Sequence, residues 1–233
     1  MLRRRVEAEM LDHLREDDPR AVRSRRDLRR INRIMGNASI VDSLLSRCLS
    51  RTPLQLAELG AGDGSLLLQL AERRAPTWRN VTLSLIDLQN LLSAPTRTAF
   101  ADLGWTVRGV AMDVFAWLER EDHPRYDAII ANLFLHHFEF DALSRLFRAV
   151  AQMTECFVAC EPRRSRVALL GSRLVGAIGA NAVTRGDAVL SVRAGFRDHE
   201  LSACWPRNGG WRVSEAGAGL FSHAFAATRR APA

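Results

Sequence analysis

The feature that most constrains the fold is a series of short apolar segments that alternate with helical patterns. These segments lack the polar alternation of a strand with one face in water, so we expect strands buried on both faces. Buried strands that alternate with helices form a parallel sheet covered on both sides. The sequence therefore predicts a doubly wound α/β fold. The expected strands are 54–60, 81–87, 105–113, 126–134 and 156–162, and the expected helices between them are 65–74, 91–104, 114–120 and 140–153.

The C-terminal third departs from this alternation. Strand-like segments at 210–217 and 220–230 are joined by a short turn, which predicts an antiparallel hairpin at the sheet edge. An insertion at about 163–208 separates them from the last parallel strand and contains an apolar helix at 165–179. A long insertion at this point of an α/β core is expected to form a lid or a wall that determines specificity.

The first 50 residues are expected to form a helical appendage or lid. One helix carries an apolar stripe of Leu28, Ile31 and Ile34, and a second helix is expected from a Ser39 cap to Leu49. The expected division is therefore a helical appendage at 1–50 and the main ligand-binding domain at 51–233.

Between the first expected strand and helix, the segment "LAELGAGDGSLLLQL" (56–70) carries glycines at 60, 62 and 64. Glycine lets the backbone turn tightly and lie against a ligand. The spacing is not the GxGxxG of dinucleotide-binding loops, and the Gly-Lys-Ser/Thr end of a phosphate-binding loop is excluded because the chain has no lysine. The acids Glu58 and Asp63 disfavour a phosphate and favour a cationic ligand.

The segment resembles motif I of class I S-adenosylmethionine-dependent methyltransferases, of the small-molecule type. Acids at the ends of the next two expected strands, Asp87 and Asp113, agree with the family pattern, and "DAIIANLFLHHF" (127–138) is similar to its motif IV. The resemblance implies a Rossmann-like fold and S-adenosyl-L-methionine as the cofactor. The cofactor-binding residues that it implies are Glu58, Gly60, Ala61, Gly62, Gly64, Asp87, Leu88, Asp113, Val114, Asn132 and Leu133.

The resemblance also implies roles for these residues. Asp87 takes the ribose hydroxyls, Asp113 takes the adenine amino group, and the backbone at 132–133 faces the methionine part. The acids also have a structural interpretation, because Asp87 and Asp113 each precede a helix that they could cap. Glu58 lies within an apolar strand, where an unpaired carboxylate is costly, so a ligand ammonium or a water is expected beside it.

Two histidines, His136 and His137, follow the fourth expected strand. A neutral imidazole there could take a proton from a substrate hydroxyl as the methyl group moves, and His137 is preferred to His136 for this role. Alternatively, both rings only line the pocket. The sequence suggests no metal site.

The expected acceptor is a small, hydrophobic or phenolic molecule that is methylated on oxygen, or next on carbon. The chain lacks the Asn-Pro-Pro-Tyr loop with which related enzymes methylate adenine or protein glutamine. A binding module without turnover stays an alternative, and a nicotinamide-dependent oxidoreductase is disfavoured by the glycine spacing. Arg163 and Arg164 are candidates to hold an acidic acceptor, and Trp205 and Trp211 are expected in the core or stacked on an aromatic acceptor.

The net charge of +7 raises the alternative of an RNA methyltransferase. All 33 basic residues are arginine, which indicates a compositional bias rather than a function. Seven of them lie between Arg20 and Arg33, where they could bind phosphates or an acidic membrane surface, or form a solvated helix face.

A cytoplasmic protein is expected because the N-terminus lacks an apolar secretion segment. No stretch is apolar enough for membrane insertion, and nucleic acid is an unlikely partner by the preceding arguments. The cysteines at 48, 156, 160 and 204 form no CxxC pair and are interpreted as buried free thiols. The sequence does not determine the oligomeric state.

Overall fold

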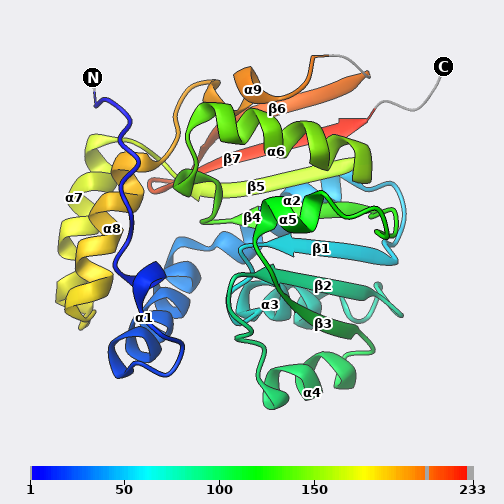
Figure 1. The fold of residues 1–233 in the computed structure, drawn as a ribbon, viewed down its shortest axis with the longest axis horizontal. Coiled ribbons are helices and arrows are strands. Elements are labelled where there is room, and N and C mark those ends of the chain that lie inside the picture. Colours follow the sequence, from blue (N-terminus) through cyan, green and yellow to red (C-terminus); the bar gives the residue numbers. More distant parts are fainter. Residues whose placement is uncertain (1, 208–209, 230–233) are drawn as a thin grey trace.

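The computed structural model describes residues 2–207 and 210–229, and a mixed sheet lies at its centre (Figure 1). The strand order is β3-β2-β1-β4-β5-β7-β6. The first five strands are parallel, and β7 runs antiparallel to both β5 and β6. This confirms the doubly wound fold with a C-terminal hairpin. The strands are β1 (Gln55–Leu59), β2 (Thr82–Asp87), β3 (Thr106–Ala111), β4 (Ala128–Asn132), β5 (Cys156–Pro162), β6 (Trp211–Ala218) and β7 (Ser222–Arg229).

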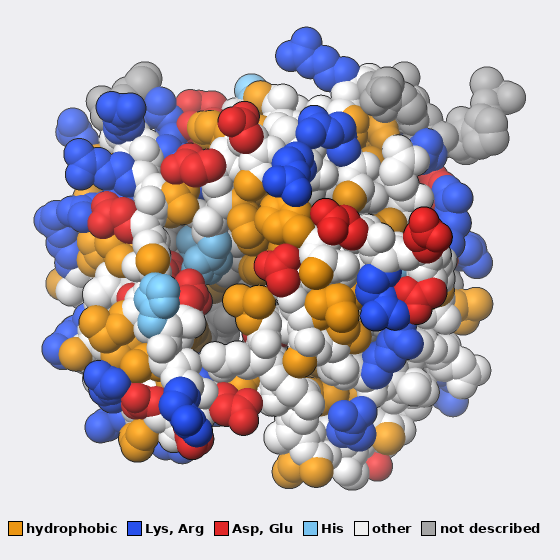
Figure 2. Space-filling model, viewed as in Figure 1, with side chains coloured by type: hydrophobic (Ala, Val, Ile, Leu, Met, Phe, Trp, Pro, Cys, Tyr) orange, Lys and Arg blue, Asp and Glu red, His pale blue; other side chains and the backbone are white. Residues whose placement is uncertain are grey.

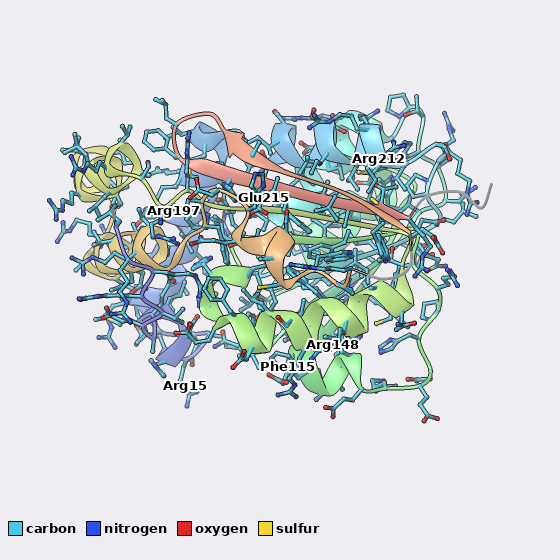
Figure 3. The ribbon with its side chains drawn as sticks, turned by 90° about the horizontal axis from the view of Figure 1, so that it is seen from above. Arg15, Phe115, Arg148, Arg197, Arg212 and Glu215 are labelled. Atoms are coloured by element: carbon cyan, nitrogen blue, oxygen red, sulfur yellow. The ribbon has the colours of Figure 1, made fainter. Side chains whose placement is uncertain are left out.

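Helices cover both faces of the sheet, as Figure 3 shows from above. One face packs against α2 (Asn37–Cys48), α3 (Ser65–Arg74) and α4 (Ala94–Asp102). The other packs against α5 (Val114–Leu118), α6 (Phe140–Met153) and α9 (Glu200–Cys204). Each strand of the centre contributes side chains to both cores, because successive residues point to opposite faces. This explains the continuous apolar segments in the sequence.

The helices α1 (Pro19–Met35), α7 (Arg166–Leu174) and α8 (Ala182–Ala194) lie beyond the carboxyl ends of the parallel strands, at the left of Figure 1. Short 3₁₀ helices occur at η1 (Leu11–His13), η2 (Leu135–His137) and η3 (Val175–Ile178). Helices α1 and α8 pack together through polar contacts. The Thr184 hydroxyl of α8 donates to Ser24 of α1 at 2.9 Å, and the backbone N–H of Asn181, which caps α8, donates to Asp27 of α1 at 2.8 Å. The insertion and the N-terminal region therefore cover one edge of the sheet together.

The first helix differs from the prediction in its packing. It begins at Pro19, where Asp18 caps it by accepting from the Arg20 backbone N–H at 2.8 Å. Its buried residues are Ala21, Ser24 and Asp27, whereas Ile34 of the predicted apolar stripe is 68% exposed. Leu28 and Ile31 are half-buried, so the prediction is wrong for the Ile34 end of the stripe. The contact of this helix with α8 is made by small and polar side chains instead.

The second helix begins at Asn37 rather than at a Ser39 cap. Gly36 has a left-handed backbone (φ 69°) and both ends α1 and begins α2. The buried side chains of Val41, Leu44 and Leu45 belong to the core on the sheet. Helix α2 is therefore part of the covering layer, while the division of the chain at residue 50 stays a prediction.

Two further predictions concern the ends of the C-terminal hairpin and the state of the cysteines. Residues 208 and 230 lie outside the described residues. Cys156 and Cys160 are buried free thiols as predicted, whereas Cys48 and Cys204 are half-buried. In the described ranges, no helix combines the length and the apolar character needed to cross a membrane.

Candidate active site

The glycine loop follows β1, and all three of its glycines have positive φ angles of 66°, 55° and 76°. A Cβ on Gly60 would overlap the ring of Phe134, and one on Gly64 would lie 2.6 Å from the Leu85 Cδ1 atom. A Cβ on Gly62 would meet no atom within 4 Å. Packing therefore requires the two outer glycines, while the middle one leaves its space open to a cavity.

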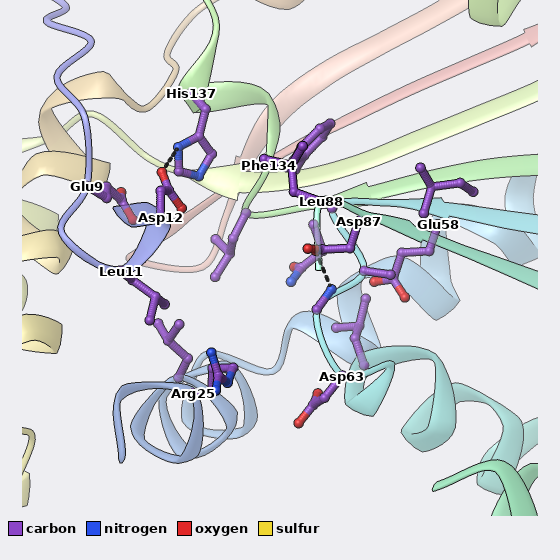
Figure 4. Close-up of a pocket in the computed structure, with 18 of the residues that line it drawn as sticks. Glu9, Leu11, Asp12, Arg25, Glu58, Asp63, Asp87, Leu88, Phe134 and His137 are labelled. Atoms are coloured by element: carbon purple, nitrogen blue, oxygen red, sulfur yellow. Dashed lines mark hydrogen bonds and ion pairs between the residues drawn. The ribbon is translucent and has the colours of Figure 1, made fainter. Parts of the chain in front are cut away.

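The loop is tied to the neighbouring strand by Asp87, the last residue of β2. Its Oδ2 accepts from the Gly62 backbone N–H at 2.9 Å, and its Oδ1 accepts from the Gln89 backbone N–H at 3.0 Å (Figure 4). The Ala61 N–H donates to the Ile86 carbonyl at 3.0 Å. The carboxylate thus holds the glycine loop and faces the cavity at the same time.

Glu58 has a buried carboxyl group with an oxygen atom that is unsatisfied within the described part of the chain. Its side chain is 2% exposed, and its Oε2 has no hydrogen-bond partner among residues 2–207 and 210–229. Burial raises the pKa of Glu58 well above its usual range, and the nearby Asp63 and Asp87 raise it further. A buried carboxyl without a partner is expensive, and a cationic ligand would relieve that cost.

Asp113 shows the capping contact that the sequence left open. Its Oδ1 accepts from the backbone N–H groups of Phe115 at 2.9 Å and Ala116 at 3.1 Å, at the start of α5. The residue also lines the cavity together with Val114. The capping hypothesis therefore describes the observed contacts, and the role toward adenine stays a prediction.

These groups surround one cavity of about 380 Å³ at the carboxyl ends of the strands (Figure 4). The structure brings the predicted histidines and all predicted cofactor residues except Gly64 to its walls. Gly64 is instead the N-cap of α3 and packs against Leu85. The predicted residues that line the cavity are Glu58, Gly60, Ala61, Gly62, Asp87, Leu88, Asp113, Val114, Asn132, Leu133, His136 and His137.

Several lining residues come from the N-terminal region and were missed by sequence reasoning. Glu9, Leu11 and Asp12 belong to what we call the N-terminal segment, residues 2–18, which crosses the cavity. Arg29 of α1 forms an ion pair with Asp63 of the glycine loop. Local sequence patterns contain no signal for this segment, because its residues have no regular periodicity.

His136 is buried between two carboxylates. Its Nδ1 lies 2.8 Å from Glu161 Oε2, and its Nε2 lies 3.3 Å from Glu9 Oε1. Glu161 is itself oriented by the backbone N–H groups of Phe134 and Leu135, at 3.0 and 2.9 Å. Burial lowers the pKa of His136, but the two carboxylates outweigh this effect and raise it to about 9.

His137 has different surroundings. Its Nδ1 lies 3.4 Å from Asp12 Oδ2 (Figure 4). Its ring centroid lies 4.3 Å from that of His136. Burial lowers the pKa of His137, and the charge of His136 lowers it further. Figure 2 shows histidine side chains next to acidic ones on this hollowed face.

The other predicted candidates lie elsewhere. Arg164 is buried, and it donates to the carbonyls of Leu2 and Gly195 and pairs with Glu200. Arg163 donates to the Gly219 carbonyl at 3.3 Å. Neither arginine lines the cavity described here, so their predicted contact with an acidic acceptor is not supported.

The two tryptophans, predicted either in the core or stacked on an acceptor, differ in how deeply they are buried. Trp205 is buried among the rings of Phe147, Phe157 and Phe225. Trp211 is half-buried at the start of β6, with the Arg229 guanidinium over its ring. Stacking on an acceptor is therefore excluded for Trp205 in this conformation.

Comparison with known proteins gives a clear result at the level of structure. In sequence, neither a family model nor a curated protein matches the chain. A solved structure of the plantazolicin methyltransferase BpumL in complex with SAH matches with a TM-score of 0.64 and 13% identity, over 92% of each chain. The chain has the fold of class I methyltransferases.

Other structures with this methyltransferase fold are similar over most of the chain. The magnesium protoporphyrin IX methyltransferase ChlM from Synechocystis PCC 6803, with bound SAH, matches with a TM-score of 0.51 and 14% identity, over 84% of this chain and 83% of that one. A putative O-methyltransferase from Nostoc punctiforme PCC 73102 matches with a TM-score of 0.58 and 13% identity. That match covers 84% of this chain and 56% of the other.

The buried Glu58 carboxyl predicts a dependence of stability on pH. Its raised pKa means that the folded protein keeps a proton that the unfolded chain releases above about pH 4.3. Without ligand, the free energy of unfolding of the wild type should therefore fall, relative to that of Glu58→Gln, as the pH rises from about 4.3 toward the raised pKa of the folded state. Each unit of raised pKa corresponds to about 1.4 kcal/mol.

Urea unfolding at a series of values from about pH 5 to pH 8 measures this difference. Glu72→Gln, on the exposed face of α3, is the matched control and should follow the wild type at every pH. A constant difference between the wild type and Glu58→Gln would show that Glu58 has an ordinary pKa.

Proposed function

We propose that the protein binds S-adenosyl-L-methionine in this cavity and transfers its methyl group to a small-molecule acceptor. The observation that carries the proposal is the buried Glu58 carboxyl, whose Oε2 has no hydrogen-bond partner among the described residues and which lines the same cavity as a glycine loop open at Gly62. A positively charged ligand that fills the open space at Gly62 is complementary to this arrangement. The methyltransferase fold and the SAH bound in similar structures support the same ligand.

The residues at the glycine loop would hold this ligand. The bound cofactor supplies a methyl group on a positively charged sulfur. Glu58 and Asp63 would provide the negative potential for its ammonium, Asp87 would accept from the ribose hydroxyls, and Asp113 with the Val114 N–H would face the adenine. Gly60, Ala61, Leu88, Asn132 and Leu133 would supply the backbone and apolar walls.

The acceptor is proposed to be hydrophobic or phenolic and to react through oxygen, with carbon as the second choice. Leu11, Leu28, Phe134 and Phe138 give the cavity apolar lining. The ring centroid of Phe134 lies 6.5 Å from that of His137. His137 would take the proton of the acceptor hydroxyl as the methyl group moves from the cofactor sulfur to the acceptor oxygen. His136 is a positioning residue in this scheme, because both of its ring nitrogens face carboxylates.

The RNA alternative has less support. Arg25 and Arg29 of the arginine-rich helix line the cavity, and Arg29 pairs with Asp63. Arg20 pairs with Asp18 on its own helix cap. A cytoplasmic location and the absence of a nucleic-acid partner stay predictions.

Ligand-dependent thermal unfolding tests the cofactor. S-adenosylhomocysteine at about 100 times its Kd should add about 2.7 kcal/mol, which raises the Tm by roughly 5 to 10 °C for a chain of this length. NAD should give no shift. Asp87→Ala should abolish the response, because the Gly62 loop loses its anchor, while Asp102→Ala on the exposed face of α4 should keep it. A shift with NAD alone would refute the proposal.

The open space at the middle glycine gives a second test. Gly62→Ala and Gly104→Ala each place a side chain at a positive φ with no atom within 4 Å, so both should lose about 1 to 2 kcal/mol of stability. Only Gly62→Ala should weaken S-adenosylhomocysteine binding, because Gly62 alone of the two lines the cavity. Isothermal titration of both variants measures this, and equal affinities would contradict the proposed position of the cofactor.

The role of His137 is tested by turnover. In chelator-treated protein, His137→Gln should lower S-adenosylhomocysteine release with any responsive phenolic acceptor by about 10² to 10⁴-fold. Binding of S-adenosylhomocysteine should be unchanged. His199→Gln, an exposed histidine outside the cavity, is the control. Unchanged turnover in His137→Gln would refute the role of this residue as the base.

A further inference from the structure

A cluster of metal-ligating side chains lies at the histidine end of the cavity. Glu9, His136 and His137 each offer a ligand atom, and these atoms all lie within 4.8 Å of one another. Bonds of about 2.0 to 2.2 Å to one metal ion place adjacent ligand atoms roughly 3.0 to 3.5 Å apart. The 3.3 Å between His136 Nε2 and Glu9 Oε1 already falls in this range.

The surroundings orient two of the three ligands. Glu161 takes the Nδ1 side of His136 at 2.8 Å, which directs the Nε2 atom toward Glu9. The Ser191 hydroxyl donates to Glu9 Oε1. A carboxylate on the far nitrogen of a histidine is the usual outer support of a metal ligand, because it fixes the ring and strengthens its basicity.

Helix α8 also fixes the N-terminal segment that carries Glu9. The Asp187 carboxylate accepts from the backbone N–H groups of Met10 and Leu11, at 2.9 and 3.0 Å. The side chain of Arg4 donates to the Phe138 carbonyl at 2.8 Å. Contacts on both sides of Glu9 therefore hold it over the histidines, although the segment has little regular structure.

The charges favour a cation between these groups. When His136 donates from Nδ1 to Glu161, its Nε2 lone pair faces the Glu9 carboxylate, and two acceptors approach so closely only with a positive charge between them. The carboxylate of Asp12 faces the second ring in the same way, at 3.4 Å from His137 Nδ1. A proton can fill one such gap, whereas a divalent ion satisfies Glu9 and both rings at once.

We infer that Glu9, His136 and His137 form a binding site for one divalent first-row transition-metal ion at the acceptor end of the cavity. Imidazole with a carboxylate suits Zn²⁺, Fe²⁺, Co²⁺ or Mn²⁺ better than Mg²⁺, which prefers oxygen ligands. The Asp12 carboxylate lies 3.4 Å from the Nδ1 atom of His137 and is a further candidate ligand.

The site would select the acceptor, and this part rests on the proposed function. Three protein ligands leave coordination positions open for the substrate. A hydroxyl with a second oxygen beside it would bind there through both atoms and release its proton to water, because the ion lowers the pKa of a bound hydroxyl. His137 then serves as a ligand in place of its role as a base, and the acceptor class narrows to chelating phenols or enols.

The test uses the full chain without a polyhistidine tag, stripped with a chelator and titrated with Co²⁺. The wild type should develop a visible d–d absorption that saturates at one ion per chain. Glu9→Gln and His137→Gln should each weaken Co²⁺ binding by more than about 100-fold, and Ser191→Ala, which removes one outer hydrogen bond, by about tenfold. The surface control His199→Gln should bind as the wild type does.

Thermal shifts with S-adenosylhomocysteine on the same samples separate the two proposals and verify folding. A shift without a Co²⁺ band in the wild type overturns the metal site and leaves the cofactor proposal intact. A Co²⁺ band without a shift supports the metal site and refutes the cofactor. Equal Co²⁺ affinity in the wild type, Glu9→Gln and Ser191→Ala also overturns the site, because the ion is then held elsewhere.

Discussion

The reversal of the chain at the centre of the sheet is the constraint on which the rest of the structure depends. Strand β1 lies between β2 and β4; the chain leaves β1 through α3 on one face, and leaves β4 through α6 on the other. Connections that depart to opposite faces open a crevice at the carboxyl ends of these two strands. The glycine loop and the histidine segment follow those strand ends, so topology alone brings them to one cavity.

Buried carboxyl groups are the second feature that the two ends of the cavity share. At one end of the cavity Glu58 is buried near Asp63 and Asp87, and Arg29 of α1 reaches only Asp63. At the other end Glu9 and Glu161 hold the ring of His136 between them. Carboxylates removed from water need a positive partner, so both ends are suited to cationic ligands. The proposed cofactor and the inferred metal ion follow from the same electrostatic argument applied at two places.

Local patterns allowed most of the fold to be predicted. The buried strands and helix α6 stand where the apolar periodicity places them, because each such element buries a continuous face in one of two cores. The failures occur where small or polar residues decide the packing. Gly36 joins α1 to α2 through its left-handed backbone, and Ser24 with Asp27 packs α1 on α8. Hydrophobic spacing contains no information about such contacts.

The sequence by itself determined the sheet, the glycine loop and the acids at the strand ends, because these depend on residues close together in the chain. The N-terminal segment became part of the site only through the tertiary structure, which joins Glu9 to His136 across 127 positions. The tertiary structure also shows that Arg164 donates hydrogen bonds to the backbone carbonyls of Leu2 and Gly195 and does not line the cavity. Contacts of this kind depend on packing between distant segments, and such packing leaves no periodic trace in the chain.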